Sequence, residues 1–185
     1  MPSWAWVLIV VAVLVVVAIA AWAFSRRRRT ERLQERYGPE YERTVREEGR
    51  RRAAEAELER REEKRRRLDI VPLSAEARDR YLRSWHDIQA RFVDEPSRAL
   101  VDADAVVEEV MRERGYPMDE FEQRAADVSV DHPDVVENYR AGHAIYLANA
   151  RGDASTEDLR QAVIHYRALF EELLETRDEA REEVR

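Results

Sequence analysis

The chain has 185 residues and a net charge of -7, from 32 Lys and Arg against 39 Asp and Glu, and it contains no cysteine. This length leaves room for one modest domain with accessory segments. The lack of cysteine excludes disulfides, thiolate metal sites and a cysteine nucleophile.

Charge divides the chain into three parts. The first 25 residues carry none, whereas residues 26–67 hold 17 basic and 11 acidic side chains, a net of +6, and residues 68–185 have a net of -13. A basic segment beside a membrane is attracted to anionic lipid headgroups, by about 1 kcal/mol per Lys or Arg near the surface. The acidic part is repelled by lipid and by nucleic acid, so we expect no nucleic-acid partner.

The first predicted element is a transmembrane helix over residues 4–24. These 21 residues contain no charge, amide, Gly or Pro. As a helix they would measure roughly 31 Å, which matches a hydrocarbon core of about 30 Å. Indole side chains, which favour the headgroup boundary, lie near both ends, at Trp4, Trp6 and Trp22.

A cleaved signal peptide is the alternative for this stretch, because residues 18–20 and 21–23 resemble cleavage sites. Signal peptides, however, begin with basic residues, and here only two uncharged residues separate Met1 from Trp4. The basic residues follow the apolar run instead, as Arg26, Arg27, Arg28 and Arg29. Positive residues beside a span remain in the cytoplasm, so we expect the N-terminus outside the plasma membrane and the rest of the chain in the cytoplasm.

Residues 25–67 are predicted to form a basic, helical juxtamembrane stalk. Arg, Glu and Ala dominate the segment, and Glu–Arg pairs recur at a spacing that stabilises a solvated helix, such as Glu57/Arg61, Glu62/Arg66 and Glu63/Arg67. Gly38-Pro39 should break this helix. From residue 40 to 67 we expect one ion-paired spacer helix of roughly 42 Å.

A coiled coil is the alternative for the stalk, and it requires an apolar stripe over several heptads. Leu33, Tyr37 and Tyr41 begin such a stripe, but beyond Val45 only alanines and Leu58 continue it. A weakly dimerising or solitary helix is therefore favoured.

Residues 68–176 are predicted to form a soluble, acidic bundle of about five helices. Capping residues and prolines mark the helix starts near Ser74, Pro96, Asp119, Asp131 and Thr156. Gly115 is placed to end the second helix. Only the short stretch 127–131 alternates as a strand would, and residues 177–185 are predicted to be a charged tail.

The predicted fold class is therefore all-α: a transmembrane helix, a charged helical stalk and a small bundle. The last helix of the bundle carries apolar side chains at heptad-like spacing, at Leu159, Val163, Tyr166, Phe170 and Leu173. We consider weak self-association through this stripe or through the stalk a further hypothesis.

Several segments carry a family resemblance: Tyr37-Gly38-Pro39-Glu40-Tyr41, 89–94, Arg114-Gly115-Tyr116-Pro117, 121–127, 131–133 and 157–162. They resemble an uncharacterised bacterial, actinobacterial-type family of single-pass membrane proteins with a C-terminal helical domain. The similarity covers nearly all of the chain beyond the anchor. It implies the architecture and no activity.

The densest polar region of the bundle contains the candidate site residues Arg124, Asp127, Asp131, His132 and His143. A metal site could be drawn from the last four, but no His-x-x-x-His or Glu-x-x-His pair places two ligands on one helical face. We expect His143 to be a hydrogen-bonded core residue, because it lies on an apolar stripe, and His132 to be a surface or capping residue. The other three could form a salt-bridge network with His132 or contact a partner.

Catalytic motifs are absent from the sequence: no serine lies in a Gly-x-Ser-x-Gly setting, and five glycines leave no phosphate-binding loop. We therefore expect a non-catalytic, membrane-anchored interaction or scaffold module with no cofactor and an unidentified protein partner. The alternative is a small membrane-tethered enzyme, or a ligand- or metal-binding domain, that uses the region 127–143.

Overall fold

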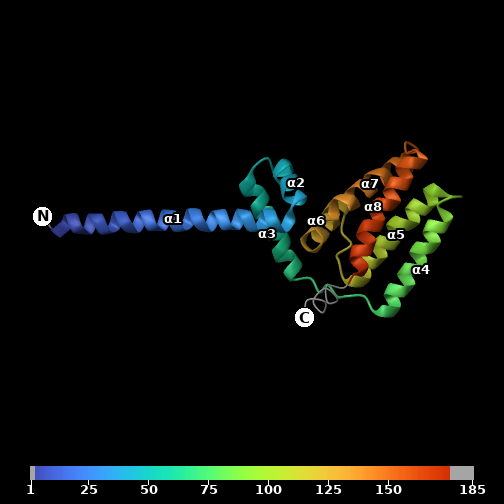
Figure 1. The fold of residues 1–185 in the computed structure, drawn as a ribbon, viewed down its shortest axis with the longest axis horizontal. Helices are drawn as coiled ribbons and strands as arrows, with labels where there is room; N and C mark the ends of the chain where they lie inside the picture. The colour runs from blue at the N-terminus through green and yellow to red at the C-terminus, as the bar shows by residue number, and fades with distance from the viewer. Residues whose placement is uncertain (1–2, 176–185) are drawn as a thin grey trace.

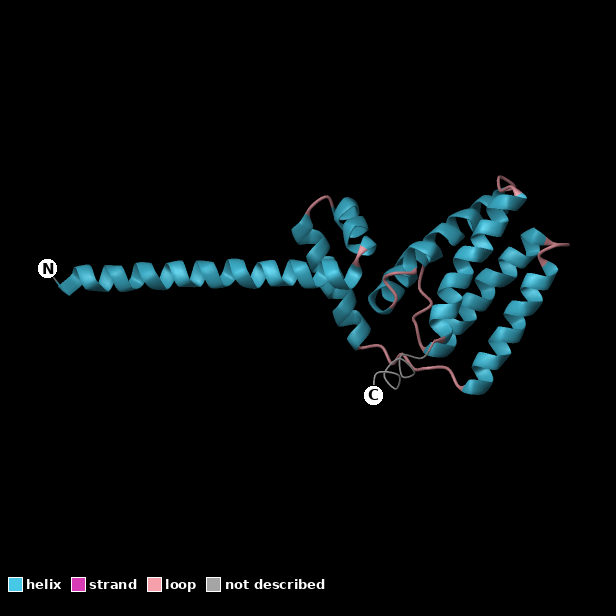
Figure 2. Cartoon of the chain, viewed as in Figure 1, coloured by secondary structure: helices cyan, strands magenta, loops and turns pink. Residues whose placement is uncertain are grey.

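The computed structural model describes residues 3–175 of the chain, and their side chains from residue 14 onward. Within this range every regular element is a helix, which confirms the predicted all-α class (Figure 2). The eight helices are α1 (Ser3–Tyr37), α2 (Pro39–Glu48), α3 (Arg51–Arg66), α4 (Ala75–Arg91), α5 (Pro96–Arg114), α6 (Phe121–Asp131), α7 (Val136–Arg151) and α8 (Thr156–Leu174). The predicted tail 177–185 lies outside the described residues.

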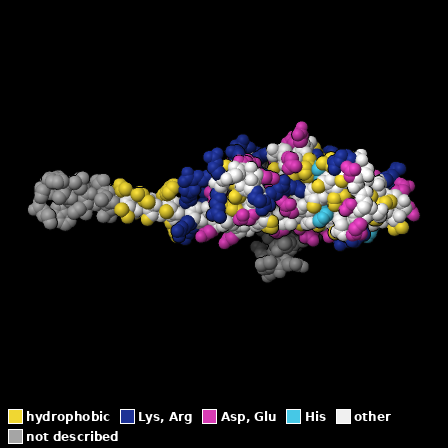
Figure 3. Space-filling view, turned by 90° about the horizontal axis from the view of Figure 1, so that it is seen from above, with side chains coloured by type: hydrophobic (Ala, Val, Ile, Leu, Met, Phe, Trp, Pro, Cys, Tyr) yellow, Lys and Arg dark blue, Asp and Glu magenta, His cyan; other side chains and the backbone are white. Residues whose placement is uncertain are grey.

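Helix α1 is one uninterrupted helix of 35 residues, and its N-terminal part projects away from the body of the molecule (Figure 1). Between residues 14 and 24 its large apolar side chains are exposed, including Leu14 at 62% and Trp22 at 62% (Figure 3). No helix within the described residues has an apolar stretch long enough to cross a membrane. Part of the predicted span 4–24, with the side chains of Trp4 and Trp6, lies outside the described side chains.

The stalk folds back on itself, so the prediction of one spacer helix from residue 40 to 67 was wrong. The break at Gly38-Pro39 is confirmed, with Pro39 opening α2. A second break follows at Gly49, whose left-handed backbone (φ 68°) ends α2 and whose N–H donates to the Val45 carbonyl oxygen at 3.0 Å. The chain then reverses into α3, which lies beside α1 (Figure 1).

Burial of the stalk's apolar stripe explains this reversal. Leu33, Tyr37 and Tyr41 pack with Leu58 of α3, and all four are at most 1% exposed. Each of the two leucines contributes about 1.5–3 kcal/mol when it leaves water. The stripe that suggested a coiled coil therefore finds its partner within the same chain.

The main core lies among α4, α5, α7 and α8, with α8 packed against both α5 and α7. The apolar stripe predicted along the last helix is buried within the bundle. Trp85 of α4 stacks on Phe170 of α8, with ring centroids 4.6 Å apart. The stripe therefore leaves no exposed apolar surface through which two copies of the chain could associate.

Most helix ends lie where the sequence placed them. Ser74 caps α4 by accepting a hydrogen bond from the Ala77 N–H, and Gly115 ends α5 with φ 94°. Two starts were wrong: Asp131 ends α6 instead of capping α7, and Ser155 rather than Thr156 caps α8. Ser155 prevails because Asp158 lies three residues later and completes a capping box with it.

Helix α6 links the two parts of the molecule, because it contacts both α3 and α7. Residues 124–130 are all buried, so this helix has little exposed face. A helix that is buried on most sides lacks the regular alternation of apolar and polar faces by which a surface helix is predicted. The stretch 127–131 could therefore be read as a strand.

Candidate functional site

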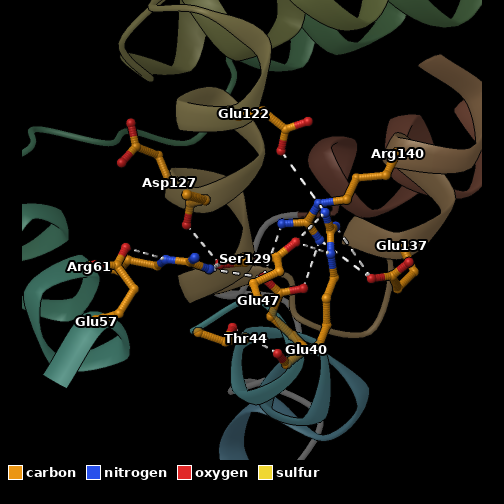
Figure 4. A network of polar contacts seen from close by, with 12 residues as sticks. Glu40, Thr44, Glu47, Glu57, Arg61, Glu122, Asp127, Ser129, Glu137 and Arg140 are labelled. Carbon is orange, nitrogen blue, oxygen red and sulfur yellow. Dashed lines mark hydrogen bonds and ion pairs between the residues drawn. The ribbon is translucent and has the colours of Figure 1, made fainter. Parts of the chain in front are cut away.

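The most deeply buried charge in the described part of the chain is Glu40, which has no exposed surface. It lies in the first turn of α2 and meets Arg61 of α3 and Arg140 of α7 (Figure 4). We call these three residues the Glu40 cluster. They join the N-terminal helices to the bundle at one point.

Both oxygens of the Glu40 carboxylate accept hydrogen bonds. Arg140 makes a bidentate contact, with Nη1 at 2.6 Å from Oε2 and Nη2 at 3.0 Å from Oε1. Arg61 donates from Nη1 to Oε1 at 2.8 Å, and its Nε donates to Oε1 of Glu57 at 3.0 Å. Charge-assisted, bidentate contacts of this kind are the strong class of hydrogen bond and fix the relative orientation of the planar groups.

Local sequence places Glu40 for this role. Pro39 opens α2, and the next residue falls in the first turn, where the helix dipole favours a carboxylate. Burial raises the pKa of the Glu40 carboxyl, and the neighbouring Arg61 guanidinium opposes that rise. Two guanidinium groups contact the one carboxylate, so the three residues form a buried ion triad in which Glu40 is the shared counter-charge.

Arg43 of α2 extends the network toward solvent. Arg43 pairs with Glu47 at 2.8 Å on its own helix and with Glu137 of α7 at 3.5 Å. Arg140 also pairs with Glu137, at 3.5 Å. The junction between α2 and α7 is therefore ionic from its buried centre to its rim.

Two of the predicted site residues tie α6 to α3. Asp127 accepts from Nζ of Lys64 at 2.7 Å, and it is 2% exposed. Asp131 pairs with Arg65 and accepts from the Tyr116 hydroxyl at 3.0 Å. Lys64 and Arg65 belong to the stalk, so these two aspartates join separate segments of the chain, whereas the predicted network linked them to Arg124 and His132.

Arg124 faces the opposite way, into the bundle. It donates from Nε to the Tyr139 hydroxyl at 2.9 Å and pairs with Glu108 at 2.6 Å. His143 is half-buried and stacks on Phe121, with centroids 3.6 Å apart. The prediction that His143 is hydrogen-bonded was wrong, because its Nδ1 has no partner among the described residues.

The five predicted residues therefore have separate neighbours and do not converge on one site. Among the residues that the structure describes, no three His, Asp or Glu side chains are arranged to hold a metal ion. Glu40, the centre of the junction, was missed. Its place after Pro39 indicates a carboxylate in the first turn of a helix but not its partners, because Arg140 lies 100 positions away.

His132 is buried, at 5% exposed, so its assignment to the surface was wrong, although it does follow α6 as its C-cap. Its Nδ1 lies 3.1 Å from Oε1 of Glu172 on α8. Burial lowers the pKa of the ring below 6.5, and Glu172 opposes this only in part. The folded state therefore takes up a proton at lower pH than the unfolded state does.

This difference predicts a loss of stability in mild acid that depends on His132. Stability is complete above the unfolded pKa and declines as the pH falls below about 6.5. Between about pH 7.5 and about pH 5.5, we expect His132 to lower the unfolding free energy by at most about 1.4 kcal/mol, the limit for a ring that stays neutral in the folded state. Thermal unfolding of the wild type and of His132→Asn at both pH values measures it; an unchanged pH dependence in the variant, with exposed His86→Asn as control, would contradict it.

Comparison with known proteins yields no match: no family model, curated protein or solved structure is significantly similar to the chain. The function is therefore inferred from the features of the chain itself.

Proposed function

We propose that the protein is a non-catalytic, single-pass membrane module that holds a helical interaction domain at the cytoplasmic face of the plasma membrane. The observation that carries the proposal is α1, a continuous helix whose exposed apolar side chains run directly into a basic segment. Residues 4–24 supply the predicted span, and Arg26–Arg29 set the orientation with the N-terminus outside.

The way α1 joins the body supports a scaffold role. The helix continues without a break from the apolar segment to Tyr37, where its side chains enter the small core with Leu58. The Glu40 cluster then connects α2 and α3 to α7 of the bundle. An uninterrupted, packed connection of this kind presents the bundle to its protein partner at a defined distance and angle from the bilayer.

No observation favours the enzymatic alternative. The polar residues between 127 and 143 that suggested it have structural neighbours: Asp127 and Asp131 pair with the stalk, and His143 stacks on Phe121.

Membrane insertion and orientation can be tested on the full chain with a reporter fused after Arg185. We expect a reporter that is active only in the cytoplasm to work, an extracytoplasmic reporter to be silent, and the chain to resist alkaline extraction. Leu14→Arg with Val17→Arg should release it, because each charge costs about 2.5–3.5 kcal/mol at the centre of a span. Val93→Arg with Val101→Arg, on exposed bundle positions, is the matched control. Reversed reporters or extraction of the wild type would refute the proposal.

A further inference from the structure

A groove opens between α1 and the N-terminal end of α3, directly after the apolar part of α1. One part of it, of about 580 Å³, is lined by Trp22, Arg26, Arg27 and Arg51, and an adjoining hollow of about 320 Å³ adds Arg29 and Arg52. Figure 3 shows basic side chains gathered where the apolar segment meets the body. The groove exists only because the stalk folds back, so it brings together arginines about 25 residues apart in sequence.

The groove carries excess positive charge. Its carboxylates belong to Glu31 and Glu55, and Glu55 accepts hydrogen bonds from Thr30 at 2.7 Å and Tyr41 at 3.3 Å. Arg29 pairs with Glu59 outside the groove. For the other four arginines no ion pair forms with a carboxylate among the described residues, so they remain available to an external anion.

The N-terminal end of α3 also favours a bound anion. Arg50, its N-cap, makes no side-chain capping bond, and the first turn contains no acidic residue but two arginines, Arg51 and Arg52. Cations at a helix N-terminus oppose the helix dipole, and the first N–H groups lack intrahelical acceptors. A bound anion at this end would satisfy these N–H groups and neutralise the arginines.

The depth of the groove indicates which anion reaches it. Thr30 contacts Glu55, and Trp22 lines the groove together with Arg51 and Arg52, so the N-terminal end of α3 lies beside the end of the apolar segment. Arg26 to Arg29 lie about 3–8 Å beyond Phe24 along the helix axis. This is the depth of the headgroup layer next to the hydrocarbon core.

We propose that this groove binds the phosphate of an anionic phospholipid headgroup, with Arg26, Arg51 and Arg52 as its cationic contacts. The inference rests on the proposed anchoring of α1. Guanidinium groups suit phosphate because they donate two parallel hydrogen bonds. One lipid held between α1 and α3 clamps the stalk at the membrane surface and defines how the bundle is presented.

The test measures lipid binding to the full chain in non-ionic detergent micelles by calorimetry. Short-chain phosphatidylglycerol should bind about tenfold more tightly than short-chain phosphatidylcholine, and inorganic phosphate should compete only weakly. Arg51→Gln with Arg52→Gln should weaken phosphatidylglycerol binding about tenfold. Arg26→Gln, on the α1 wall of the groove, should weaken it about threefold and serves if the double variant fails to fold.

Arg83→Gln with Arg112→Gln is the matched control, because both are exposed arginines of the bundle and the change in net charge is equal. Equal binding of the two lipids, or an equal loss in this control, would overturn the proposal. Equal competition by inorganic phosphate would make the groove a free-anion site and overturn the lipid assignment. Failure of the anchor is distinguishable, since it appears as alkaline extraction of the wild type, whereas failure of the groove leaves extraction unchanged.

Discussion

Glu40→Gln is expected to lower the free energy of unfolding by about 3–5 kcal/mol, because it leaves two buried guanidinium groups without their shared counter-charge. Arg61 and Arg140 each have about one tenth of their side-chain surface exposed, so water cannot replace the carboxylate. Urea unfolding of the full chain in detergent micelles, followed by far-ultraviolet circular dichroism, measures the effect.

Glu42→Gln is the matched control, because it removes the same charge from an exposed position two residues further along α2. We expect this control to change stability by no more than about 0.5 kcal/mol. The double variant Glu40→Gln with Arg140→Gln should be more stable than the sum of the two single effects predicts, since the residues contact each other. A loss below about 1 kcal/mol for Glu40→Gln would show that the junction is not held by this cluster.

The helices of the bundle could be predicted because their signals are local. Ser74, Pro96 and Gly115 act within one turn of their own helix, and the structure has all three at the predicted helix ends. The buried face of α8 could also be predicted, because its apolar residues recur along one helical face. Errors arose where two local signals competed, as with Ser155 and Thr156.

The fold of the stalk could not be predicted in this way, because its decisive contacts are distant in sequence. Glu40 meets Arg140 across 100 positions, and no spacing rule for a single helix reports such a pair. Local pairing also yields to tertiary pairing within α3: Glu57 bonds Arg61 as predicted, but Glu62 pairs with Arg32 and Arg36 of α1.

In the candidate site, too, local signals could be predicted and contacts distant in sequence could not. Asp127 and Asp131 were recognised as unusual polar residues, but their partners Lys64 and Arg65 belong to a segment that was expected to stand apart as a spacer. Once α3 folds back against α6, these pairs explain the polar residues as structural. The groove between α1 and α3 could not be predicted either, since it depends on the reversal of the chain at Gly49.

Gly115→Ala is expected to destabilise the protein by about 3–4 kcal/mol, well beyond the usual effect of replacing a helix-ending glycine. Its backbone has φ 94°, which costs any other residue about 1–2 kcal/mol. In addition, an added Cβ would overlap the carbonyl oxygen of Asp69. Relieving that overlap moves the segment that joins stalk and bundle, and it strains the hydrogen bond from the Val71 N–H to the Arg114 carbonyl oxygen, now 2.9 Å.

Gly152→Ala separates the two contributions, because Gly152 also ends a helix with positive φ (78°) but has nothing within 4 Å of an added Cβ. It should cost only the backbone share, about 1–2 kcal/mol. Thermal and urea unfolding of both variants give the difference, which measures how tightly the joining segment is docked on α5. Equal losses would mean that this segment yields freely, and the contacts of α1, α2 and α3 with α6 and α7 would then tie the bundle to the stalk.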